Sequence, residues 1–285
     1  PMNWKRPFSR RKPPVVAVLR LDGTIGASAS RFRGSMLNIQ SQAARIERAF
    51  KIRKLSAVAL VVNSPGGSPV QSALIAGRIR ALAEERELPV IAFAEDVAAS
   101  GGYWLACAAD EIFVNEATIL GSIGVISAGF GFHELIEKYG IERRVHAAGE
   151  NKAILDPFLP ERPEDVERLK QAQAGIHDHF KDYVCARRGD RVDRNSDELF
   201  SGAFWTGARA VELGLADGLG DIRTVLREKY GDDVRLVPVT GRKSVIRSVM
   251  GRTEFAMPQG SARVDLPEQA LAAIEQRLTW ARFGL

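Results

Sequence analysis

A serine followed by two glycines, at Ser100, Gly101 and Gly102, is the first candidate for chemistry in this sequence. The triplet follows an apolar run and opens a segment predicted as a helix, so the serine would lie among N–H groups that a helix start leaves unpaired. Glycine lets a substrate backbone approach closely, and the Gly101 N–H could stabilise the oxyanion formed when Ser100 attacks a carbonyl. A plain helix cap or turn fits the same spacing, so both interpretations stay open.

A second glycine turn covers residues 63–68, Asn-Ser-Pro-Gly-Gly-Ser, between another predicted strand and a predicted helix. If strands 57–62 and 89–94 are neighbours in a parallel sheet, both turns emerge at its carboxyl edge, where open α/β sheets bind ligands. Gly67 and Gly101 would then supply the two N–H donors of an oxyanion hole. A phosphate cradle or a tight turn is the alternative, although no Walker-type Lys-Ser/Thr follows to favour a nucleotide.

A serine nucleophile needs a base, which the sequence offers as histidine or lysine. His177 and His179 lie two apart on a predicted helix and point to different faces, whereas His133 and His146 are placed at a helix start and in a strand. No carboxylate stands at a suggestive spacing, so a Ser-His-Asp triad is only an alternative. Lys152 follows a predicted strand and precedes an apolar run, which predicts partial burial. An ordinary surface lysine is the other interpretation.

The elements that must position these residues follow an α/β pattern. Apolar runs bounded by turn residues predict buried strands, and their alternation with helical periodicity predicts a parallel sheet with right-handed crossovers. Ser68 to Gln71 is a predicted capping box with Pro69 at the first helical position. The predicted strands are 15–21, 57–62, 89–94, 111–114 and 125–127. Helices are predicted after residues 68, 100 and 207, and over 133–138, 163–187 and 267–283.

Charge and composition exclude several classes of protein. The formal net charge is +5, but residues 1–12 hold five basic residues and no acid, so the rest is near neutral and a folded nucleic-acid surface is not expected. The absence of a long apolar run predicts a cytoplasmic chain without a transmembrane segment, with possible peripheral contact between the basic tail and the inner membrane. Cys107 and Cys185 lack metal-ligand spacing, and neither a metal nor an organic cofactor is indicated.

Five motifs together resemble the signal peptide peptidase A family, peptidase family S49, in its single-length form. These are Ser-Lys peptidases whose fold is related to the Clp protease subunit and to crotonase. The likeness runs from about residue 15 to residue 239, with the motifs in the family's order. They are residues 63–67 (Asn-Ser-Pro-Gly-Gly), 99–104 (Ala-Ser-Gly-Gly-Tyr-Trp), 118–125 (Thr-Ile-Leu-Gly-Ser-Ile-Gly-Val), 149–152 (Gly-Glu-Asn-Lys) and 204–210 (Phe-Trp-Thr-Gly-Ala-Arg-Ala) continuing to 214–217 (Gly-Leu-Ala-Asp).

The resemblance implies an α/β, crotonase/Clp-protease-like fold with a parallel sheet core and flanking helices, and a serine endopeptidase activity. It implies Ser100 as nucleophile, Lys152 as general base, Gly67 and Gly101 as oxyanion donors, and Ser122 as the hydroxyl that orients the lysine. It also implies homo-oligomeric rings in which a site borrows residues from its neighbour. The expected substrates are signal-peptide remnants or other small or unfolded polypeptides.

Three parts of the chain are distinguished: a basic tail over 1–13, expected to be disordered, a peptidase domain over 14–240, and a C-terminal extension over 241–285. Most family members carry an N-terminal membrane anchor that this sequence lacks, so the substrate's location is open. Two other classes remain as alternatives. A crotonase-like acyl-CoA-binding enzyme would bind CoA and tolerate Ser100→Ala, and a non-catalytic scaffold ring would not be labelled at Ser100 by a serine-reactive phosphonate.

Overall fold

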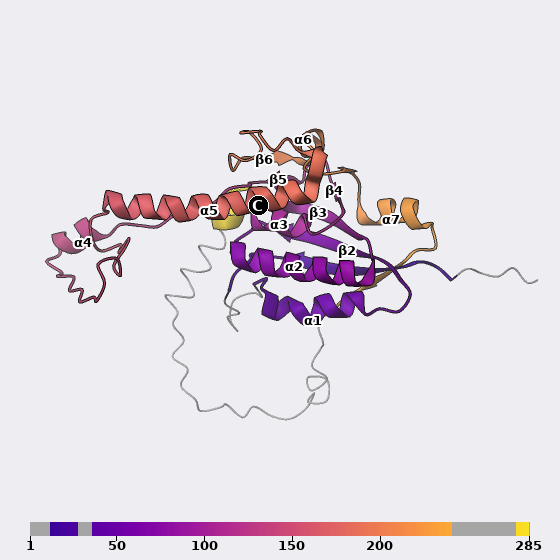
Figure 1. Ribbon diagram of the computed structural model, residues 1–285, viewed down its shortest axis with the longest axis horizontal. Coiled ribbons are helices and arrows are strands. Elements are labelled where there is room, and N and C mark those ends of the chain that lie inside the picture. Colours follow the sequence, from indigo (N-terminus) through magenta and orange to yellow (C-terminus); the bar gives the residue numbers. More distant parts are fainter. Residues whose placement is uncertain (1–11, 28–35, 241–277, 285) are drawn as a thin grey trace, which may run out of the picture.

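The computed structural model describes residues 12–27, 36–240 and 278–284, and Figure 1 shows a layered α/β body from which a long arm extends. All but the last two residues of the predicted tail over 1–13 lie outside the described residues. The same holds for the extension over 241–285, apart from 278–284. Of the helix predicted over 267–283, the structure describes one helical turn at 278–281.

The body is built on an eight-stranded sheet with the order β6-β5-β3-β2-β1-β8, to which β4 and β7 are joined beside β3. All pairs are parallel except β5 with β6. The long central strands are continuous apolar runs because helices cover both faces. The strands are β1 (Val15–Asp22), β2 (Leu55–Ser64), β3 (Val90–Ala99), β4 (Glu111–Val114), β5 (Ile119–Gly121), β6 (Phe204–Thr206), β7 (Gly218–Leu219) and β8 (Arg235–Pro238).

The register of the central strands brings their carboxyl ends to one edge. Leu21 of β1 is opposite Val62 of β2, which is opposite Ala94 of β3. The pairing of β2 with β3 then shifts, so that Ser64 is opposite Ala98. The glycine turn after β2 and the Ser-Gly-Gly turn after β3 therefore leave the sheet side by side, as the sequence predicts.

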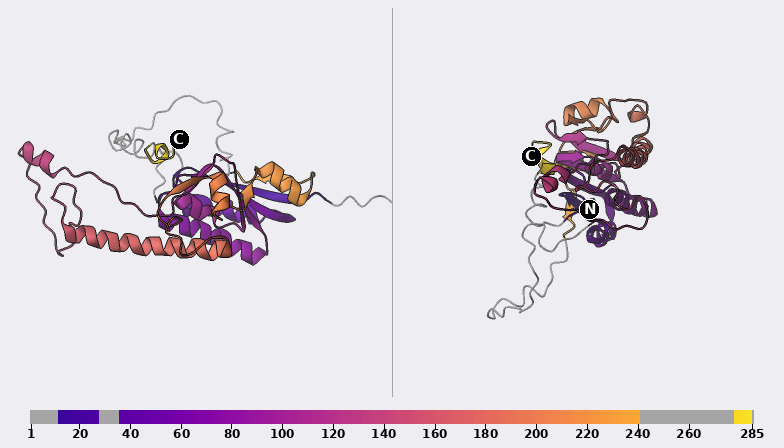
Figure 2. Two further views of the ribbon diagram at one scale, coloured as in Figure 1. Left: turned by 90° about the horizontal axis from the view of Figure 1, so that it is seen from above. Right: turned by 90° about the vertical axis from the view of Figure 1, so that its left-hand side faces the viewer.

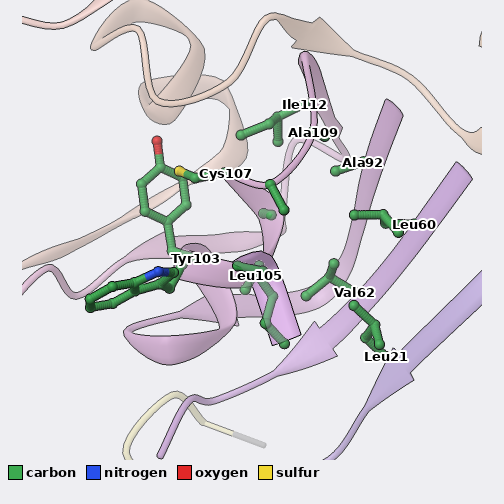
Figure 3. Packing of buried hydrophobic residues seen from close by; sticks show 14 of the residues in the cluster. Leu21, Leu60, Val62, Ala92, Tyr103, Leu105, Cys107, Ala109 and Ile112 are labelled. Carbon is green, nitrogen blue, oxygen red and sulfur yellow. The ribbon is translucent and has the colours of Figure 1, made fainter. Parts of the chain in front are cut away.

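Helices cover the two faces unequally. One face packs against α1 (Ile39–Phe50), α2 (Pro69–Arg86), the short α3 (Gly101–Ala106) and the end of α5 (Pro163–Arg188), and the other against α7 (Ile222–Tyr230). Figure 3 shows Leu105 of α3 toward Val62 of the sheet, with Tyr103 and Cys107 on the opposite side of the helix. The remaining helical elements are α4 (His133–Lys138), the 3-10 turn η1 (Gly189–Arg191) and α6 (Gly207–Glu212).

The start of α2 departs in one detail from the predicted capping box. The Ser68 hydroxyl accepts the Gln71 N–H, and Pro69 occupies the first turn, as predicted. The Gln71 side chain, however, does not return to Ser68. It accepts the Ile39 N–H at 3.0 Å, and the Ser68 N–H donates to the Ile25 carbonyl. This exchange ties the start of α2 to the start of α1 and to the chain beyond β1.

Residues 125–162, called the arm below, leave the body at the end of the sheet and carry α4 at their far end (Figures 1 and 2). None of these residues is buried. The strand predicted over 125–127 is wrong, and so is the strand around His146, since no strand forms over 122–162. β5 ends at Gly121 and is paired with β3 on one side and β6 on the other, and residues 125–127 leave the sheet beyond that end. None of the described helices is long and apolar enough to cross a lipid bilayer.

Candidate active site

Ser100 occupies the sharp turn between β3 and α3. Its backbone has φ 53° and ψ −122°, a conformation that residues with a side chain rarely adopt and that costs on the order of 1–3 kcal/mol. Two hydrogen bonds hold it there: the Ser100 N–H donates to Gly121 at 2.7 Å, and its carbonyl accepts the Trp104 N–H at 3.0 Å. The hydroxyl caps no helix N–H. The turn therefore presents an uncommitted hydroxyl at the edge of the sheet.

Gly67 lies close to Ser100 because the chain after β2 is bound to the chain after β1. The Ile25 N–H donates to Gly66, and the Ser68 N–H donates back to Ile25. A Cβ on Gly67 would lie 2.0 Å from the Ile25 carbonyl oxygen, and its φ of 139° excludes other residues as well. The Gly67 N–H itself has no acceptor in the described part of the chain.

Gly101 brings the second N–H to the same place. As the first residue of α3 its N–H has no partner one turn earlier, and none is recorded among the described residues. A Cβ built on Gly101 would lie 2.5 Å from the Ser72 hydroxyl and 3.4 Å from the Gly67 nitrogen. Two unpaired backbone donors thus flank the Ser100 turn, which is the arrangement that an oxyanion hole requires.

Ser122 lies in the turn that follows β5, with φ 52°. Its N–H donates to Ala203 at 2.7 Å, and the residue before it, Gly121, accepts the Ser100 N–H. The next residue along, Ile123, offers its carbonyl to Nε2 of His177 at 3.1 Å. The Ser100 and Ser122 turns are therefore joined through one backbone hydrogen bond and are fixed as a unit.

A cavity of about 800 Å³ opens over this unit. Ser100, Gly67 and Ser122 line it, and a small apolar recess beside Ser100 and Gly101 reaches Trp104 and Phe180. The walls come from widely separated segments: the turn 65–69, residues 124–127, one face of α5, the turn 201–202 and the C-terminal segment 278–284. Four of the five predicted site residues are thus brought together at one cavity.

Lys152 is not at this cavity. It lies on the arm, exposed, in a turn in which its N–H donates to Gly149 at 3.1 Å. The predicted partial burial is wrong for the isolated chain, because the apolar run after Lys152 stays at the surface of the arm, with Leu155 36% exposed. Figures 1 and 2 show this segment far from the carboxyl edge of the sheet. The single chain therefore holds Ser100 and Lys152, the predicted nucleophile and base, apart.

His177 is the histidine that the structure places at the cavity. Because a carbonyl oxygen only accepts, its Nε2 must donate to Ile123, so that nitrogen is engaged. His179 faces the other way and packs on the Trp104 ring at 5.4 Å, so the predicted divergence of these two residues is confirmed. No carboxylate from the described residues lines the cavity, and a Ser-His-Asp triad is not assembled there.

The support beneath α3 is a feature that the sequence did not reveal. Trp104 stacks on Phe180 of α5 at 4.6 Å, and the Tyr103 hydroxyl donates to Leu215 at 2.9 Å. Below them Arg188, 1% exposed, pairs with Asp217 at 2.7 Å. Burial opposes ionisation of Asp217, but the hydrogen bonds from Arg188 and the Ile112 N–H outweigh it and hold the pKa of that carboxyl below its usual value. α3, which follows Ser100, therefore packs on a buried, ion-paired support.

Comparisons with known proteins identify a matching family and several relatives of this chain. The model of peptidase family S49 matches residues 83–233. The chain is 48% identical over 99% of its length to a Brucella abortus protein named as a Na⁺/H⁺ antiporter, but covers 39% of that protein. It is 32% identical over 73% of its length to a chloroplast serine protease of Arabidopsis thaliana, of which it covers 31%. A putative protease of Synechocystis is 30% identical over the whole of this chain, which covers 96% of that protein.

Among solved structures, a variant of a membrane-bound stomatin-specific protease matches 81% of this chain and 99% of its own, with a TM-score of 0.50 and 16% identity. At that identity the likeness concerns the fold alone, and it confirms the predicted α/β fold with a parallel sheet core. The chain spans about two fifths or less of the length of the Brucella and Arabidopsis relatives.

Proposed function

This chain belongs to peptidase family S49, whose members are serine peptidases, and we propose that it hydrolyses peptide bonds with Ser100 as the nucleophile and Lys152 of a neighbouring copy as the base. The proposal rests on one observation above all. Ser100 is held in a strained turn between two unpaired backbone donors, Gly67 and Gly101, at a cavity of about 800 Å³. Strain and free donors of this kind cluster at active sites because folding alone does not need them.

A neighbouring copy is proposed as the source of the base because the chain's own Lys152 lies out on the arm. The arm exposes an unusual number of large apolar side chains, and exposed apolar patches mark contact surfaces. A second copy of the chain would account for both observations. It would cover the exposed apolar side chains of the arm, and its own Lys152 would supply the base that the Ser100 cavity lacks. The exposed apolar residues of the arm are Ile126, Phe130, Phe132, Leu135, Tyr139, Ile141, Val145, Leu155, Phe158 and Leu159.

Part of the arm has a defined shape that a partner could recognise. The Phe132 ring packs on Phe158 at 5.7 Å, and Arg143 lies over the same Phe158 ring at 5.5 Å. Arg143 also pairs with Asp156 at 3.0 Å, and the Phe158 N–H with Arg143 lowers the pKa of the Asp156 carboxyl. This cluster fixes the chain just after Lys152. The arm is therefore suited to carry a lysine to a defined position on another molecule.

In the proposed reaction the amine of Lys152 takes the Ser100 proton while the Ser100 oxygen attacks the peptide carbonyl. The Gly67 and Gly101 N–H groups stabilise the oxyanion, and Ser122 orients the amine. The intermediate collapses as the protonated lysine gives its proton to the leaving amine, which leaves an acyl-enzyme on Ser100. A water molecule, deprotonated by Lys152, then hydrolyses the ester, and Ser100 regains its proton.

The substrates we propose are signal-peptide remnants or other small or unfolded polypeptides, because a folded chain could not reach a Ser100 that is walled by α5 and the C-terminal segment. Assembly into a closed ring is proposed with the shared site. A cytoplasmic location stays a prediction. Contact of the basic tail with a membrane also stays a prediction, and residues 1–11 of that tail lie outside the described part. Antiport, named for the Brucella relative, is not proposed for a chain that covers 39% of that protein.

Mixing two inactive variants tests the shared site. Ser100→Ala and Lys152→Ala are each expected to lack turnover of an unfolded peptide, and unfolding and reassembling them together should restore part of the activity, since some interfaces join an intact Ser100 to an intact Lys152. Lys138→Ala, which alters another lysine on the arm, is the matched control and should keep its turnover. Wild-type turnover in Lys152→Ala would refute the pair. Mixed assemblies that stay inactive would place the base within one chain.

Labelling of Ser100 by a serine-reactive phosphonate, located by mass spectrometry, separates the peptidase from the other two classes. We expect label on Ser100 in the wild type and none in Ser100→Ala. A scaffold ring would take no label. An acyl-CoA-binding enzyme would bind CoA measurably by calorimetry and keep its activity in Ser100→Ala.

A further inference from the structure

The C-terminal segment 278–284 forms one wall of the cavity that holds Ser100. Thr279, Arg282 and Phe283 all line it. The Phe283 ring packs edge-on against Phe204 of β6, with 5.3 Å between ring centres and 69° between planes. Figure 2 shows the segment close to the body and not out along the arm. The last described residues are therefore part of the wall of this cavity.

The strand that anchors this segment also fixes the Ser122 turn. Phe204 is opposite Gly121 in the β5–β6 pair, and the neighbouring Ala203 accepts the Ser122 N–H. Phe283 therefore packs on the strand that holds the turn beside Ser100. Arg282, which directly precedes Phe283, is held at the same cavity by this contact.

Arg282 has an unusual electrostatic position. It is the one permanently charged side chain among the described residues that line the cavity, and no carboxylate from those residues lines it. Most arginines of the body are ion-paired, for example Arg188 with Asp217 and Arg80 with Asp110. Arg282 makes no ion pair with any described residue. A guanidinium left without an acidic partner inside a binding cavity is a ready site for a carboxylate from a ligand.

We propose that Arg282 binds a carboxylate of the peptide substrate, so that the enzyme selects peptides that carry a negative charge close to the scissile bond. This inference rests on the proposed peptidase function. A cavity of about 800 Å³ corresponds to a sphere about 11–12 Å across, which an extended peptide crosses in roughly three residues. The carboxylate belongs either to the C-terminus of a short peptide or to an aspartate or glutamate side chain within that reach.

Three matched peptides that differ only in charge test the proposal. The first ends in a free carboxylate two or three residues beyond the cleavage site, the second is its C-terminal amide, and the third is the amide with an aspartate in place of an asparagine inside the same reach. The wild type should cleave the first or the third about fivefold faster in kcat/KM than the neutral amide, as for a partly exposed ion pair. The peptide that is favoured tells which carboxylate Arg282 binds.

In Arg282→Gln the ratio of kcat/KM for the charged peptide to kcat/KM for the neutral peptide should fall to about one. Arg282→Lys should retain part of this preference. Arg223→Gln, which removes an exposed arginine on α7, is the matched control and should keep the full ratio. Raising the salt to about 0.5 M should shrink the ratio in the wild type. The thermal midpoint of each variant is measured alongside, so that a folding defect is recognised.

Equal cleavage of charged and neutral peptides by the wild type would overturn the role of Arg282, and so would an unchanged ratio in Arg282→Gln. Both outcomes leave the peptidase itself intact. Failure of the proposed function has a different signature: no peptide is cleaved at any charge, and Ser100 takes no phosphonate label.

Discussion

The two halves of the proposed dyad are built on opposite kinds of structure. Ser100 lies in a turn fixed by hydrogen bonds to β5 and α3, over a core in which Tyr103, Leu105 and Cys107 are fully buried. Burial raises the pKa of the Cys107 thiol to about 12, which marks it as an inert core group. Lys152 lies on an arm in which no residue is buried and Phe130 is 76% exposed.

This difference shows that the fold of the single chain fixes the position of Ser100 but not that of Lys152. A strained nucleophile needs a rigid surrounding that folding of the single chain already supplies. A base on an exposed arm has no such surrounding until something packs against it. The body and the arm should therefore respond differently to the same kind of substitution, and the following predictions measure that difference from the largest expected effect to the smallest.

Removing either half of the dyad should abolish turnover to the same extent, although one residue is built into the core edge and the other is exposed. We expect losses of about 10⁴-fold or more in kcat for Ser100→Ala and Lys152→Ala, and the double variant should be no worse, because the two act as a unit. Steady-state cleavage of an unfolded peptide measures this. A Lys152→Ala loss below about tenfold would mean that the arm plays no part in the chemistry.

Breaking the ion pair under α3 should destabilise the body strongly. Arg188→Ala leaves Asp217 partly buried beside Arg191 alone, and we expect a loss of about 3 kcal/mol in the free energy of unfolding. The matched change on the arm, Arg143→Ala, removes a half-exposed partner and should lower the urea midpoint much less. Urea denaturation compares the two. Similar losses would show that the arm is as much a part of the folded unit as the body.

Gly67→Ala tests the oxyanion donor. Its Cβ would meet the Ile25 carbonyl at 2.0 Å, so the turn must shift and its N–H must move. Removing one donor costs about 10²–10³-fold in kcat, and we expect a loss in that range with phosphonate labelling slowed in proportion. Gly77→Ala on α2, where the new Cβ meets nothing, is the control for helix and folding effects. Full activity in Gly67→Ala would remove this donor from the site.

Substitutions on the apolar surface of the arm should act through assembly. Phe130→Ser removes a side chain that is 76% exposed and whose one ring contact among the described residues is with Phe132 at 6.2 Å, so the thermal midpoint should hardly change. Specific activity should fall several-fold at low enzyme concentration and recover at high concentration, as measured by activity against dilution together with light scattering. Activity that is independent of concentration in both proteins, with a monomer in solution, would contradict a shared site.

The smallest expected effect is an acid sensitivity of the body. The folded-state pKa of Asp217 is depressed, so its stabilisation is present above the ordinary carboxyl pKa of about 3.9 and is lost as the pH falls below that value through the folded pKa. The gap in urea midpoint between wild type and Asp217→Asn should therefore narrow between pH 5 and pH 2.5. A constant gap over that range would mean that the carboxyl charge contributes nothing.

The sequence predicts the body well because its signals there are local. The apolar runs of β1 to β4, the capped start of α2 and the two glycine turns each follow from a few neighbouring residues, and parallel pairing then brings Gly67, Ser100 and Gly101 to one edge. The same reasoning gave wrong predictions for the arm. Residues 125–127 and the chain around Lys152 have apolar patterns typical of buried segments, but no residue of the arm is buried in the structure.

Other parts of the site were hidden for a different reason. His177 and Arg282 come to the cavity through contacts that join distant segments, namely Ile123 with α5 and Phe204 with Phe283. Neither residue stands in a local motif, so spacing gives no signal for them. The aromatic stripe of α5 was visible in the sequence, but its pairing of Phe180 with Trp104 under the nucleophile was not.

The placement of Lys152 on the arm has a consequence for the cell that makes this protein. If the base arrives only from a second chain, a newly synthesised copy is a zymogen that needs no pro-segment, and activation requires an encounter and not a cut. For a site shared by two chains, the concentration of active enzyme in a dilute solution then rises with about the square of the protein concentration, and the active fraction rises in proportion to it. Such a peptidase would be inactive at low protein concentration, and dilution alone would keep it so.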